Sequence, residues 1–68
     1  MYALKYHCND NVITLLTNKS KFQLIKQLKI IASMFLNDAK TQEVQMYSTH
    51  FQAINNDGTK IQYSVVKY

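Results

Sequence analysis

The chain contains no arginine, proline or tryptophan, and it has one glycine and one cysteine among 68 residues. Cys8 has no partner for an intrachain disulfide, and no group of histidine and cysteine has the spacing of a zinc site. Gly58 alone cannot form a glycine-rich phosphate-binding loop. A domain without these supports must be stabilised by good packing or by oligomerisation.

Acidic residues are few, which argues against catalysis by paired carboxylates. They lie in or next to predicted turns, where side-chain oxygens bond the local backbone: Asp10, Asp38, Glu43 and Asp57. His7, Cys8 and His50 are the remaining candidates for nucleophilic or metal chemistry. Strand alternation directs Cys8 inward and His7 outward, so these neighbours cannot form a Cys-His pair. We therefore expect no enzymatic activity, no metal and no cofactor.

Long hydrophobic runs are also missing. The most apolar stretch, Ile30 to Leu36, is interrupted by Ser33 and is too short to cross a bilayer. The amino end from Met1 has neither a basic start followed by an apolar run nor a small-residue cleavage site. We expect one intracellular, cytoplasmic domain over residues 1–68, with no membrane partner.

Side-chain alternation predicts strands on both sides of a central helix. The expected strands are Tyr2 to Cys8, Val12 to Thr17, Glu43 to Ile54 and Thr59 to Tyr68. Asp57-Gly58 tolerates the positive φ of a hairpin turn. The sequence therefore predicts an α+β fold of order β-β-α-β-β, a small antiparallel sheet of about four strands with one helix packed on one face. Parallel neighbours stay open where the helix acts as a crossover.

A lone helix leaves the second side of the sheet to face water or a partner. On this assignment that side is mildly polar, and its members are Ala3, Lys5, His7, Ser48, His50, Gln52, Lys60, Gln62, Ser64 and Val66.

The predicted helix, Ser20 to Leu36, has more large apolar residues than a buried face needs. Projected at about 100° per residue, its buried seam is Leu24, Leu28, Ile31 and Phe35, edged by Ile25, Ala32 and Leu36. Ile30 and Met34 fall on the opposite wall, four residues apart and so neighbours on the surface. We expect both to be exposed in a monomer and to form the apolar centre of a partner-binding face, which comprises Gln23, Lys26, Gln27, Ile30 and Met34.

Charge and composition indicate the kind of partner. The net charge of +4 comes from eight lysines, and four of them lie between Asp10 and Asp38, a stretch with no acidic residue. A basic helix favours a partner with an acidic surface. Frequent Asn, Lys, Ile and Tyr is typical of AT-rich genomes. In size and composition the chain resembles, in general character, the small inhibitors that bacteriophages make against host proteins, although no motif carries the likeness.

Three hypotheses follow from the sequence. The leading one is a non-enzymatic, phage-encoded protein that binds a host protein through the helix face and blocks it sterically, with an exposed sheet edge as a second surface. The alternative is a small basic regulator that binds DNA or RNA phosphates, which the absence of arginine disfavours. A third is a homodimer whose helices pair through Ile30 and Met34.

Overall fold

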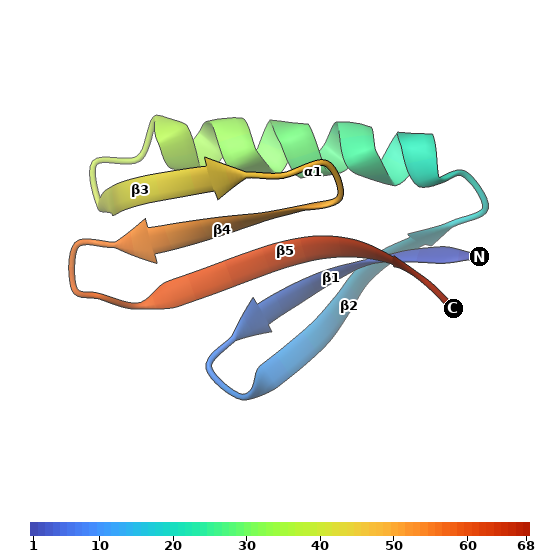
Figure 1. Ribbon diagram of the computed structural model, residues 1–68, viewed down its shortest axis with the longest axis horizontal. Coiled ribbons are helices and arrows are strands. Elements are labelled where there is room, and N and C mark those ends of the chain that lie inside the picture. Colours follow the sequence, from blue (N-terminus) through green and yellow to red (C-terminus); the bar gives the residue numbers. More distant parts are fainter.

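The computed structural model describes residues 1–68 and shows a ββαβββ arrangement (Figure 1). The elements in chain order are β1 (Tyr2–Cys8), β2 (Asn11–Asn18), α1 (Lys21–Leu36), β3 (Thr41–Met46), β4 (His50–Asn55) and β5 (Lys60–Lys67). The predicted fold class is confirmed: an antiparallel sheet with one helix packed against one face.

The sheet has five strands in the order β2-β1-β5-β4-β3, and every neighbouring pair is antiparallel. The chain therefore leaves the sheet at one edge, β2, crosses through α1, and re-enters at the opposite edge, β3 (Figure 1). The termini lie together, since the Tyr68 amide donates to the Met1 carbonyl at 3.1 Å. This topology leaves β2 and β3 as the two strands with an unpaired edge.

The sheet has one strand more than the sequence pattern predicts. The segment expected as one strand, Glu43 to Ile54, is a hairpin of β3 and β4. The chain reverses without a glycine or proline, and the Tyr47 amide closes the turn by donating to the His50 carbonyl at 2.9 Å. Tyr47 consequently lies in the turn and is exposed, whereas alternation with the outward Ser48 and His50 predicts it on the inner face. The predicted turn at Asp57-Gly58 is present, with Gly58 at φ +88°.

The core lies between α1 and the inner face of the sheet. Leu24, Leu28 and Ala32 are buried on the helix, and they pack against buried side chains of β1, β4 and β5, namely Leu4, Phe51, Ala53, Ile61 and Val65. Full burial of one such large side chain stabilises the fold by about 1.5–3 kcal/mol. Leu36, expected at the edge of the buried seam, is 69 % exposed. It stands on the last turn of α1, on the flank next to β3.

The helix begins and ends close to its predicted bounds. Ser20 is the N-cap residue with an extended backbone, but its side chain makes no capping bond. The Asn18 side chain instead accepts a hydrogen bond from the Ser20 amide at 2.8 Å, which fixes the entry into α1. At 16 residues, α1 is not long and apolar enough to cross a membrane.

Candidate protein-binding surface

The helix does not cover the edge of the sheet that β2 forms. All eight residues of β2 are exposed, although four of them are large and apolar: Val12, Ile13, Leu15 and Leu16. In Figure 1, α1 runs beside β3, whereas the β1–β2 hairpin splays away from it. An apolar strand of this kind is usually half-buried, so its exposure marks a surface that a single copy of the chain does not cover.

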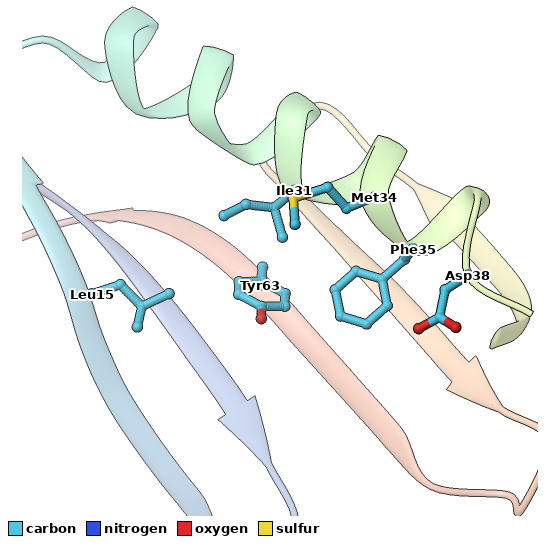
Figure 2. Close-up of a pocket in the computed structure, with 6 residues that line it drawn as sticks. All are labelled: Leu15, Ile31, Met34, Phe35, Asp38 and Tyr63. Carbon is cyan, nitrogen blue, oxygen red and sulfur yellow. The ribbon is translucent and has the colours of Figure 1, made fainter. Parts of the chain in front are cut away.

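A groove of about 450 Å³ lies between α1 and β2. Its lining comes from three elements and the helix end: Leu15, Ile31, Met34, Phe35, Asp38 and Tyr63. Figure 2 shows Leu15 on the strand side, the helix residues on the other side, and Tyr63 between them. The volume is within the range of pockets that hold an apolar ligand or the side chains of a partner.

Packed aromatic rings form the floor of this groove. The Tyr63 ring stacks on Phe51, with ring centroids 5.0 Å apart, and contacts Tyr6 at the same centroid distance. Phe35 leans against both Phe51 and Tyr63, at 5.8 and 5.9 Å. Phe51 is fully buried, so the cluster is anchored in the core. A floor held in this way is preformed, which lowers the entropic cost of binding.

Two polar groups belong to the otherwise apolar lining, the Tyr63 hydroxyl on the floor and the Asp38 carboxylate at the end of α1. Burial raises the pKa of the Tyr63 hydroxyl further above neutral pH, so the phenol keeps its proton and can donate a hydrogen bond. At the end of α1, one carboxylate oxygen of Asp38 accepts a hydrogen bond from the Lys40 amide at 2.9 Å. An apolar centre bounded by a few polar groups is the usual composition of a recognition site.

The five residues predicted to bind a partner are all exposed on α1: Gln23, Lys26, Gln27, Ile30 and Met34. Ile30 is 54 % exposed and Met34 is 66 % exposed, as the helical projection predicts. Met34 also lines the groove, so the predicted face continues into it. The Lys26 side chain packs over the exposed ring of Phe22, with its ammonium 4.8 Å from the ring centroid. We call the surface of Ile30, Met34 and the groove lining the β2-side surface.

The β2 contribution to this surface was not among the predicted partner-binding residues. Periodicity identified the strand but gave no measure of how far the helix would cover it. One signal was available in the sequence, because Asn11 to Asn18 contains no charged residue although every side chain faces solvent. The structure thus adds Leu15, which forms one wall of the groove, to the predicted partner-binding residues.

The sheet separates Cys8 from His7 and His50, the other candidates for nucleophilic or metal chemistry. Cys8 packs against the core on the inner face. His7 lies on the outer face, where its Nε2 is 3.1 Å from the Oγ of Ser64, a buried hydroxyl. His50 stacks on Tyr47 with ring centroids 4.5 Å apart. The His7–Ser64 bond thus satisfies a polar group that burial would otherwise leave unpaired.

Comparison with known proteins gives no relative for this chain. No family model matches it, and no match was found among curated proteins or solved structures.

Proposed function

We propose that the chain is a small protein-binding inhibitor that docks its β2-side surface onto another protein and blocks that protein sterically. One observation carries the proposal. An exposed apolar helix flank, Ile30 and Met34, runs into a preformed apolar groove. A contiguous patch of this kind on a small domain is typical of an interaction site, whereas scattered single hydrophobes need no explanation.

The partner we infer presents large apolar side chains with acidic residues around them. The groove has room for apolar groups, and its lining contains no lysine. The lysines that could attract a partner are exposed elsewhere on α1, and Lys29 lines the groove on the β3 side. Since the helix carries Lys21, Lys26 and Lys29 and no acidic residue, acidic groups on the partner would be steered toward it. The chain composition favours a bacteriophage origin, and hence a host protein in the bacterial cytoplasm as the target.

Paired substitutions on the two flanks of α1 test this proposal. Ile30→Asp with Met34→Asp places two charges on the β2-side surface. Leu36→Asp with Met46→Asp places the same charges around the smaller groove between α1 and β3, where both residues are exposed. The wild-type chain, immobilised in a lysate of a low-GC bacterium, should retain one host protein, which is then purified and titrated with each variant.

The expected result is a loss of at least about 100-fold in affinity for the first variant, because buried unpaired charges are costly at an interface. The second variant should bind within about threefold of the wild type, as substitutions outside an interface core do. Equal losses in both variants, or full binding by the first, would reject the β2-side surface as the binding site. Circular dichroism checks that both variants remain folded.

Nucleic-acid binding is the competing function, and the exposed lysines of α1 favour it. Phosphate contacts are salt-sensitive, so the discriminating measurement is a salt titration with duplex DNA or heparin. Binding that persists near about 0.2 M salt and is lost in Lys26→Glu with Lys29→Glu would replace the inhibitor proposal. Under the inhibitor proposal, the wild-type chain shows no such binding.

A further inference from the structure

The outward edge of β2 lacks most of the features that keep sheet edges from pairing. Edge strands of monomeric proteins are usually short, charged, interrupted by proline or covered. β2 is eight residues long and contains no charge and no proline, and each of its residues is exposed. Its one protective feature is an irregularity at Leu15, an extra residue where the register against β1 shifts between Leu4 and Lys5.

The sequence of β2 is similar in residue character when read in either direction, apart from the central Thr14-Leu15. Asn-Val-Ile-Thr-Leu-Leu-Thr-Asn has asparagine at both ends, a β-branched residue next to each end, and Ile13 and Leu16 in equivalent positions. A two-fold interface uses one patch on both subunits, so the patch must be complementary to itself. The three outer pairs of positions meet that requirement, and only the central Thr14 and Leu15 differ in character.

The extra residue also places equivalent side chains on the same face. Ile13 pairs with Tyr6 and Leu16 with Leu4, which both point into the core side of the sheet. Val12 pairs with His7 and Thr17 with Ala3 on the outer face.

In a regular strand, two residues separated by an odd number of positions would point to opposite faces. The extra residue at Leu15 brings Ile13 and Leu16 to one face and Val12 and Thr17 to the other.

We propose that two copies of the chain associate by antiparallel pairing of their β2 strands about a two-fold axis between Thr14 and Leu15. Ile13 then lies opposite Leu16 of the partner subunit, and Val12 lies opposite Thr17 of the partner subunit. The pairing joins the two sheets into one of ten strands, five from each copy. No charged side chain of β2 meets its own copy, although each chain carries a net charge of +4.

The other edge does not fit a closed pair as well. β3 has six residues and carries Glu43, which a two-fold pairing would bring near its own copy. Pairing of β2 with β3 of another copy would be heterologous and would build an open-ended chain. The β2–β2 pairing is the arrangement that closes.

This dimer would bring two β2-side surfaces together. A two-fold axis perpendicular to the sheet leaves both helices on the same face, so the grooves face each other across the paired strands. The inference does not rest on the proposed inhibitor function, since it concerns the edge of β2 and not the occupant of the groove.

Two double variants that differ only in the sign of one charge test the pairing. Val12→Lys with Thr17→Lys sets like charges opposite each other at both symmetric positions. Val12→Lys with Thr17→Glu sets opposite charges there instead. Both positions lie on the outer face, away from the groove, so binding at the groove is measured separately. Urea unfolding of each variant confirms that the individual chain is folded.

Sedimentation equilibrium gives the mass of each species. At about 0.1 mM the wild-type chain should have the mass of two chains, as a micromolar Kd requires. The lysine–lysine variant should be monomeric, and the lysine–glutamate variant should dimerise at least about tenfold more tightly than it. A monomeric wild type, equal behaviour of the two variants, or growth into polymers would overturn the proposal.

Discussion

The two edge strands of the sheet differ in how much of their apolar surface the helix covers. β3 lies beside α1, and its Val44 is half-buried against the core. β2 lies at the far edge, and none of its eight residues is buried, although it has four apolar side chains where β3 has two. One helix cannot cover five strands, so the position of the helix determines which apolar side chains remain on the surface.

The edges also differ in the features that prevent association. β3 is shorter, polar and charged at Glu43, whose carboxylate accepts a hydrogen bond from the Gln45 amide group at 3.0 Å. β2 is uncharged, and it forms one wall of the groove. The β3 edge thus has features that discourage strand pairing, and the β2 edge has those of a surface that binds.

The largest difference in the free energy of unfolding is expected between a substitution in the core and one on β2. Phe51→Ala removes a fully buried ring that supports the groove floor, so the free energy of unfolding should fall by about 3–5 kcal/mol. Ile13→Ala removes a side chain that is 52 % exposed, and monomer stability should change by less than about 1 kcal/mol. Urea unfolding of dilute protein measures both. Similar losses would mean that β2 is part of the core.

A smaller effect is expected at the turn that presents β2. Asn9 has φ 55° between β1 and β2, a conformation that asparagine and glycine adopt more readily than other residues. Asn9→Ala should therefore lower the free energy of unfolding by about 1 kcal/mol, whereas Asn9→Gly should leave it nearly unchanged. Thermal unfolding followed by circular dichroism checks the pair. Equal stability of the alanine and glycine variants would contradict the left-handed turn.

The half-buried Tyr63 of the groove floor should make stability fall in alkaline solution. Because burial raises the pKa of Tyr63, the unfolded chain releases this proton at a lower pH than the folded chain does. Stability is therefore unaffected below pH of about 10 and falls as the pH rises from there through the folded-state pKa. Tyr63→Phe should reduce that slope in urea unfolding series, and Tyr68→Phe, at the exposed chain end, should not. An unchanged slope in Tyr63→Phe would place the hydroxyl in water.

A second tyrosine contributes to the same alkaline slope. The pKa of Tyr6 is raised by its hydrogen bond with Cys8 and by burial. For this reason Tyr63→Phe should reduce the slope without abolishing it.

The smallest effect should come from making the covered edge resemble the open one. Glu43→Val removes the only charge of β3, and we expect weak new self-association, about 1 kcal/mol or less. Sedimentation velocity of this substitution, made in the monomeric lysine–lysine background, would detect it. A marked increase in mass, comparable to that of the wild type, would show that the charge alone protects β3 and that the helix contributes little.

Helical periodicity predicted much of what the structure shows, because it depends on local geometry. The projection placed Leu24 and Leu28 in the core and left Ile30 and Met34 exposed, as the structure has them. It was wrong for Leu36, which the last turn directs past the sheet. The β3–β4 turn was missed because Tyr47-Ser48-Thr49 contains no glycine, proline, asparagine or aspartate. Alternation continues through those residues and reads as one strand.

The groove could not be predicted, because it depends on strand order and helix position. Leu15 and Tyr63 are 48 positions apart in the chain and meet only when β5 inserts between β1 and β4. The exposure of β2 likewise follows from its place at the far edge. Local sequence patterns contain neither piece of information, whereas the missing charge of β2 is visible in the sequence and indicates an unusual strand.

The methionines allow the central comparison to be tested within one molecule. The chain has three: Met34 on the β2-side surface, Met46 at the β3 edge and Met1 at the amino end, all of them exposed. Methyl NMR of the chain labelled at methionine, recorded alone and in complex with the captured host protein, reports on each site separately. The Met34 signal should shift or broaden on binding while the Met46 signal stays in place. A shift of Met46 with an unchanged Met34 would contradict docking through the β2-side surface.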